Sequence, residues 1–125
     1  WRHIPNSHGV PADAVIGKSD LILGGSSTIG PSALNAPAGL LMANGGLVVA
    51  DKGFHRVVYF RNLPSVNGGA VDSVLGQSDT RVGIQNNHTL APIKRLSSPS
   101  SIFQVGERWF IADTGNSRIV AVRRP

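Results

Sequence analysis

The chain has 125 residues, enough for one ordinary domain, and its hydrophobic content of 41% allows a packed core. It contains no cysteine, which excludes disulfides, cysteine–zinc sites, iron–sulfur clusters and a cysteine nucleophile. The net charge of +5 comes from 12 basic and 7 acidic residues, and because the basic residues are scattered we interpret it as a shortage of acids rather than a nucleic-acid site.

The first part of the chain predicts a short strand, a loop and then four strands. Residues 1–20 contain the edge-like strand "DAVIG", and residues 21–36 form a variable loop of small and apolar residues. Within residues 37–79, the segments "AGLLMA", "GLVVAD", "RVVYFR" and "DSVLG" each predict a strand. The continuous apolar run in "GLVVAD" is typical of a strand that is buried on both faces.

The remainder of the chain follows the same plan. Residues 80–98 form a second variable loop, and residues 99–125 contain the predicted strands "SSIFQV", "RWFIAD" and "RIVAVR". No segment has helical periodicity, and no apolar run is long enough to span a bilayer. We therefore expect an all-β fold.

The chain contains two copies of one unit. "ADAVIGKSD" recurs as "VDSVLGQSD", which places Asp13 and Asp72 59 residues apart. "LVVADKGFHRVVYF" recurs as "WFIADTGNSRIVAV", which places Asp51 and Asp113 62 residues apart. A repeated unit of four short antiparallel strands is typical of a β-propeller blade.

The turn after each "AD" motif brings an acid opposite a base. Asp51 is expected to face Arg56 across the first hairpin, and Asp113 to face Arg118 across the second. With Gly53 at the first central position, we predict a type II′ turn in the first copy. We interpret both pairs as exposed structural clamps, worth about 0.2–1 kcal/mol each, whose main value lies in fixing strand register.

Most carboxylates fall at matched positions of the two copies, which favours a structural role over acid–base chemistry. Only Glu107 has no counterpart among them. The matched pairs are Asp13 with Asp72, Asp20 with Asp79, and Asp51 with Asp113.

The block "P-x-x-[LI]…[VI]-A-D-x-G-x-x-R-[VI]" resembles the NHL repeat, a β-propeller blade. The second copy, "ADTGNSR", is close to the pattern of that family, whereas the first departs from it at Lys52, Phe54 and His55. The resemblance implies a blade in residues 37–79 and the first three strands of another in residues 99–125. Propellers of this family close with about six blades, within the usual range of about four to eight.

Two blades alone would leave two broad apolar faces in water, which soluble monomers rarely tolerate. We therefore expect either a homotrimer of two-blade subunits or a longer chain with flanking blades. In both cases residues 1–20 would supply a fourth strand that completes a neighbouring blade.

Residue types give few candidates for chemistry. The four histidines do not repeat and have no metal-ligand spacing, and no nucleophile elbow is present, so we expect no catalytic residue, metal or cofactor. The variable loops are the better candidates for binding, because loops carried by a rigid scaffold often bind. The second loop supplies the candidates Arg81, His88, Lys94 and Arg95.

We interpret the chain as a non-catalytic scaffold or binding module that engages a protein or glycan partner through its inter-blade loops. One alternative is RNA binding by a basic propeller face, which the placement of most aromatic residues within strands disfavours. A second alternative is a metal-assisted lyase or hydrolase built on an oligomer axis. The sequence does not fix the compartment, although an extracellular, cell-surface or periplasmic location is slightly favoured.

Overall fold

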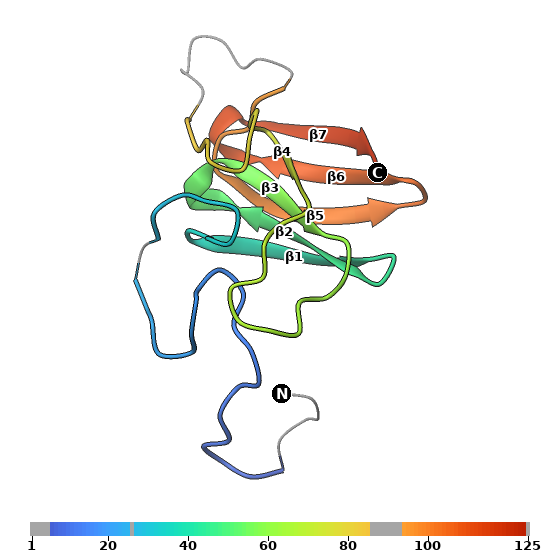
Figure 1. Ribbon diagram of the computed structural model, residues 1–125. Helices are drawn as coiled ribbons and strands as arrows, with labels where there is room; N and C mark the ends of the chain where they lie inside the picture. The colour runs from blue at the N-terminus through green and yellow to red at the C-terminus, as the bar shows by residue number, and fades with distance from the viewer. Residues whose placement is uncertain (1–5, 26, 86–93, 125) are drawn as a thin grey trace.

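The protein is all-β, with two antiparallel sheets and two short 3₁₀ turns, as Figure 1 shows. The computed structural model describes residues 6–25, 27–85 and 94–124. The first sheet has the order β1-β2-β3-β4, and the second has the order β5-β6-β7. The elements are β1 Pro37–Ala43, β2 Gly46–Asp51, η1 Lys52–Phe54, β3 Arg56–Phe60, β4 Ser73–Leu75, β5 Pro99–Val105, β6 Arg108–Asp113, η2 Thr114–Asn116 and β7 Arg118–Arg123. The all-β prediction is confirmed, and no helix in this part of the chain is of a length and apolarity to cross a membrane.

The two sheets pack face to face through one core cluster. Side chains of a strand alternate between its faces, so Val48 and Ala50 of β2 point toward the second sheet. They meet Trp109 and Ile111 of β6, and the ring of Trp109 lies 5.6 Å from that of Tyr59. β2 is buried along its whole length, as its continuous apolar run predicts.

The opposite face of the first sheet is covered by the N-terminal part of the chain. A second core cluster joins Leu47 and Val49 of β2 to Val58 and Phe60 of β3, with Leu34 and Val71 from the connecting segments. Ile16 packs against this cluster from the segment "DAVIG". Residues 13–17 form no strand in the structure, so their role as a fourth strand of another blade stays a prediction.

Both hairpins end in the same turn, but the predicted type II′ geometry is wrong. Asp51 pairs with Arg56 as expected, yet a 3₁₀ turn and a left-handed residue, His55 with φ of 53°, complete the connection. Ser117 has the same role in the second hairpin, with φ of 52°. A four-residue loop places the positive φ at its last position, so Gly53 needs none. Glycine is required there because a Cβ atom would lie 2.8 Å from the carbonyl oxygen of Asn35.

Candidate functional site: the loop end of the sheets

The two variable loops leave the sheets at the same end. β4 runs into residues 76–85, and residues 27–36 run into β1, both on the side that carries η1 and η2 (left in Figure 1). We call this side the loop end. The turn between β1 and β2 and residues 61–72 lie at the other end of the strands.

The loop end is organised around a buried ion pair, not the exposed pair that the sequence predicts. Arg56 Nε lies 2.8 Å from Asp51 Oδ2, and both side chains are fully buried. Asp51 Oδ1 also accepts the backbone N–H of Asn35 at 2.7 Å. Two charges removed from water need this degree of hydrogen bonding to persist. The stabilisation of about 0.2–1 kcal/mol that is typical of an exposed ion pair therefore does not apply to this pair.

Arg56 also joins the two variable loops to each other. Its guanidinium donates to the carbonyl oxygen atoms of Ala33 at 2.7 Å and Gly30 at 3.2 Å, both in the first loop. It donates as well to the carbonyl oxygen of Thr80, at the start of the second loop. The ring of Phe54 lies 5.0 Å from the guanidinium carbon and closes the site from one side. The hairpin clamp is thus also the anchor of both loops.

The second clamp repeats the first with more exposure to solvent. Arg118 Nε lies 2.8 Å from Asp113 Oδ2, and Asp113 Oδ1 accepts the N–H of Ser97 at 2.6 Å. Arg118 donates to the carbonyl oxygen of Arg95 at 2.9 Å, and its side chain is 30% exposed. Asn116 donates to Asp113 at 2.7 Å. The repeated geometry supports a structural role for both acids.

Burial shifts two pKa values at the first clamp. Burial raises the pKa of Asp51, against the opposing effects of the Asn35 amide and of Arg56. Burial lowers the pKa of His55, against the opposing charge of Asp51. Because His55 Nδ1 accepts the N–H of Ser98 at 3.0 Å, the hydrogen bond requires that nitrogen to be unprotonated. His55 thereby connects the first hairpin to the start of the second sheet.

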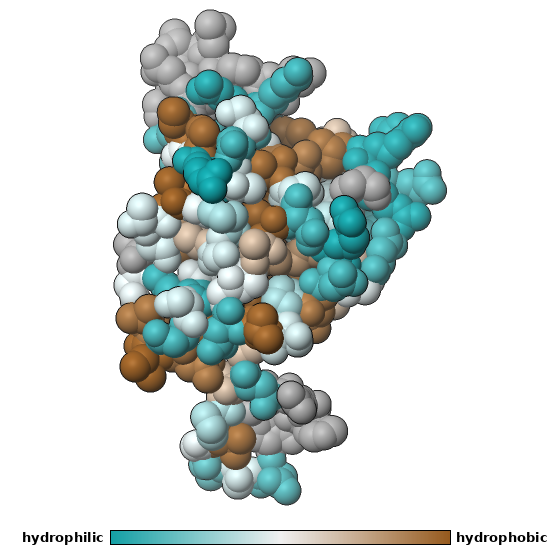
Figure 2. Space-filling model, viewed as in Figure 1, coloured by the Kyte–Doolittle hydropathy of each residue, from teal (hydrophilic) through white to brown (hydrophobic). Residues whose placement is uncertain are grey.

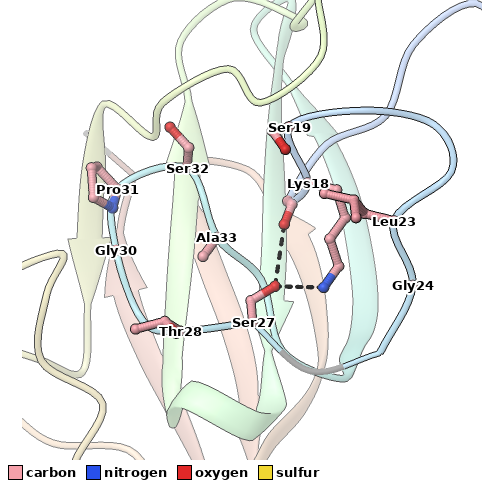
Figure 3. Close-up of a pocket in the computed structure, with 11 residues that line it drawn as sticks. Lys18, Ser19, Leu23, Gly24, Ser27, Thr28, Gly30, Pro31, Ser32 and Ala33 are labelled. Atoms are coloured by element: carbon pink, nitrogen blue, oxygen red, sulfur yellow. Dashed lines mark hydrogen bonds between the residues drawn. The ribbon is translucent and has the colours of Figure 1, made fainter.

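A cavity of about 460 Å³ lies within the first loop (Figure 3). Small and hydroxyl-bearing side chains form its wall, among them Ser27, Thr28 and Ser32. Lys18 Nζ donates to Ser27 Oγ at 2.7 Å and to the carbonyl oxygen of Gly25 at 2.6 Å. The lysine therefore ties the start of the loop to Gly25 and Ser27 beside this open cavity, and the hydroxyl groups of Thr28 and Ser32 add polar atoms to its wall.

The tip of the first loop is exposed and aliphatic. Asp20 Oδ1 accepts the backbone N–H groups of Ile22 at 3.0 Å and Leu23 at 2.9 Å, which folds the tip into a compact turn. Ile22 is 93% exposed, with Leu21 at 46% and Leu23 at 52%. Figure 2 shows hydrophobic side chains gathered at the lower left, where this loop lies in Figure 1. We call Leu21–Leu23 the apolar tip.

The matching acid of the second copy, Asp79, has a similar local role. Asp79 Oδ1 accepts the N–H of Arg81 at 2.9 Å and the hydroxyl of Thr80 at 3.2 Å. These hydrogen bonds lower the pKa of Asp79. Asp72 lies directly before β4, where its carboxylate accepts the N–H of Arg61 at 2.7 Å. Five of the matched carboxylates thus accept backbone N–H groups: Asp20, Asp51, Asp72, Asp79 and Asp113.

Two of the predicted binding residues, Arg81 and Lys94, border different cavities. Arg81 borders a cavity of about 340 Å³ beside Phe54, and Lys94 borders a different cavity between β4 and β7. Arg95 is exposed, and His88 lies outside the described residues. Sequence reasoning missed the cavity of the first loop, although the run of serine, threonine and glycine in residues 24–32 was a signal for it. Within the described residues, no three His, Asp or Glu side chains gather in a way that could hold a metal ion.

No protein-family model matches the chain, and no curated protein is similar to it at a significant level.

Proposed function

We propose that the two sheets are consecutive propeller blades of the NHL type, and that the protein is a non-catalytic binding module. Its partner, a protein or a glycan, is engaged through the loop end. The support for the blade assignment is the repetition of geometry in both sheets. The strand order, the acid–base clamp and the left-handed residue after each 3₁₀ turn all recur. Fold alone does not give function, so the binding role rests on the loops.

One observation carries the binding role: the fully buried Arg56 ties both unrepeated loops to the rigid sheets. Loops held in this way keep one conformation, which lowers the entropy lost when a partner binds. A merely tolerated insertion would need no such anchor at the centre of the scaffold.

The apolar tip and the neighbouring cavity indicate how a partner would be held. An exposed side chain such as Ile22 buries apolar area on binding and acts as an anchor in a pocket of the partner. The hydroxyl groups of Ser27 and Ser32 would add directional hydrogen bonds at the rim. An aliphatic anchor favours a protein over a glycan, because sugar rings present few apolar surfaces of matching shape.

The test is selection of binders from a random-peptide phage library and, in parallel, from a glycan array. We expect binders whose affinity falls at least tenfold, about 1.4 kcal/mol, on Ile22→Ser. The matched control is Val66→Ser, which removes a side chain that is 66% exposed at the other end of the strands. The proposal would be refuted if the two substitutions reduced affinity equally, or if no selected binder lost affinity on Ile22→Ser.

An RNA titration tests the alternative function, RNA binding by a basic face. If a single-stranded RNA oligonucleotide binds with an affinity that falls steeply with salt, phosphate contacts dominate and the protein is a nucleic-acid binder. We expect no such binding. Arg81→Ala compared with Arg61→Ala, a substitution at the opposite end, would locate it.

A further inference from the structure

β7 is the outer strand of the second sheet within the described residues, and a cavity of about 300 Å³ lies along it. The walls are mostly apolar and come from both sheets, with the polar side chains of Gln77 and Lys94 also lining the cavity. Leu96, Ile111, Val120 and Val122 line one side, and Val74 and Leu75 of β4 line another. An edge strand beside an apolar cavity is a template for pairing with a further strand.

The first sheet shows which strand fits there. In that sheet β4 pairs with β3, with Val74 opposite Val58, and Val74 packs on the cluster that contains Leu34, Val49 and Phe60. The residues 62 positions later are Leu96, Ile111, Val120 and Val122. These four residues form one wall of the cavity along β7. The cavity therefore repeats the surface that seats Val74.

The counterpart of Val74, 59 positions earlier, is Val15 in the segment "DAVIG". Within its own chain, this segment contacts the first sheet in the way that the fourth strand of the first sheet, β4, contacts the second sheet. Gly76 has φ of 88°, and a Cβ atom there would lie 2.6 Å from Leu96; Gly17 has φ of 90°, and a Cβ atom there would lie 2.8 Å from Leu34. Residues 13–17 thus contact the first sheet as β4 contacts the second.

The buried contacts of the segment agree with this placement. Leu75 packs against the cluster between the sheets, and its counterpart Ile16 packs against the outer cluster of the first sheet. The backbone of Val15 is bonded to Asn67 Oδ1 at 2.9 Å and to the N–H of Gly68 at 3.2 Å. Pairing with another strand would exchange these bonds for ladder bonds, so no buried polar group would be left unsatisfied.

The exposed side chains on each sheet also have buried counterparts in the other sheet, which agrees with this placement. Phe103 and Ile119 on the outer face of the second sheet are 60% and 65% exposed. Their counterparts in the first sheet, Leu41 and Val57, pack in the cluster between the sheets. On β1, Leu40 is 68% exposed, whereas its counterpart Ile102 is buried in that cluster. The half of the contact that the first sheet contributes therefore recurs as an exposed face of the second sheet. The half that the second sheet contributes recurs on the first sheet, where Leu40 is exposed while Val49, Val58 and Phe60 are already buried in the second core cluster.

We infer that β7 of one copy pairs with residues 13–17 of a second copy, which seats Val15 in the cavity and stacks the outer face of β5–β7 on the first sheet of that copy. The two faces differ, so the contact is head-to-tail and generates a ring if the rotation between sheets closes. A propeller ring has about four to eight blades, and the ring of about six blades expected from the sequence takes three chains. The inference rests on repeat geometry and holds whether or not the loop end binds a partner.

The absence of native cysteine allows a direct test by disulfide trapping in the full chain. By the register of β4 on β3, Ala14 falls opposite Ala121 of the other copy. Oxidation of the Ala14→Cys, Ala121→Cys variant should yield covalent dimers and trimers on a denaturing gel. The control, Val66→Cys with Ala121→Cys, should remain monomeric on that gel. Equal cross-linking of both variants, or an intramolecular bond alone, would overturn the inference.

A second measurement does not depend on any substitution in the cross-linking pair. Light scattering of the unsubstituted chain should give about three times its mass of 13.1 kDa. Val15→Asp, which places a charge in the apolar cavity, should reduce that mass to one chain, whereas Val66→Asp should not. A monomeric unsubstituted chain would overturn the inference, and because neither assay uses a ligand, that result would leave the proposed function to its own test.

Discussion

Replacing Arg56 by alanine should destabilise the fold far more than the same change at Arg118. The guanidinium of Arg56 is fully buried, and its removal leaves the carboxylate of Asp51 buried without its charged partner. The carbonyl oxygen atoms of Ala33 and Thr80 lose their donor at the same time. Breaking a buried pair in this way costs about 3–5 kcal/mol.

The second clamp should lose only about 1–2 kcal/mol on Arg118→Ala. The arginine side chain is 30% exposed, so water can replace part of its interaction. Asp113 also keeps the donors Ser97 and Asn116, at 2.6 and 2.7 Å. The difference between the two variants therefore measures the burial of the first clamp.

Urea denaturation at a single protein concentration, followed by the fluorescence of the buried Trp109, gives the free energy of unfolding. Arg61→Ala, at an exposed position, should stay within about 0.5 kcal/mol of the parent. If Arg56→Ala does not fold, Arg56→Lys provides a milder comparison. The double variant Asp51→Ala, Arg56→Ala should cost less than the sum of the single changes. A cost for Arg118→Ala equal to that for Arg56→Ala would refute the argument.

Two further outcomes follow from the turn geometry and from His55. Gly76→Ala should cost more than about 1 kcal/mol, because its φ is 88° and the added Cβ would lie 2.6 Å from Leu96. Gly9→Ala, with φ of 74° but no atom within 4 Å, should cost less in the same urea titration, and equal costs would contradict the role of the contact. The lowered pKa of His55 means that the unfolded chain binds the proton more readily. Its contribution to stability should therefore be complete above its ordinary pKa of 6.5 and be lost as the pH falls below that value. His55→Asn, which suits the left-handed conformation, should flatten this dependence in unfolding experiments across pH 5–8, and an unchanged slope would show that another group titrates.

Local patterning was enough to predict the strands and their pairing. A continuous apolar run such as Leu47–Ala50 reads as a buried strand because side-chain period and burial are short-range properties. The repeat then aligned Asp51 with Asp113 and placed an arginine opposite each. Both pairs appear in the structure at the expected register.

The nature of those pairs could not be predicted in the same way. Arg56 was expected to be exposed because a hairpin considered alone leaves its end in water. Its burial depends on Ala33 and Thr80, which lie 23 and 24 residues away along the chain. The predicted turn type was wrong for a related reason. Gly53 is required by its close contact with Asn35 and not by a positive φ of its own.

The order of the strands and the alignment of the two copies could therefore be predicted from the sequence, because each depends on residues within a single unit. The packing of two sheets, the burial of one clamp and the partial exposure of the other, and the cavity along β7 were decided only by tertiary structure. These features arise where segments of different units meet, and neither unit encodes them alone. The same reasoning explains why the predicted binding residues Arg81 and Lys94, close in the sequence, border different cavities.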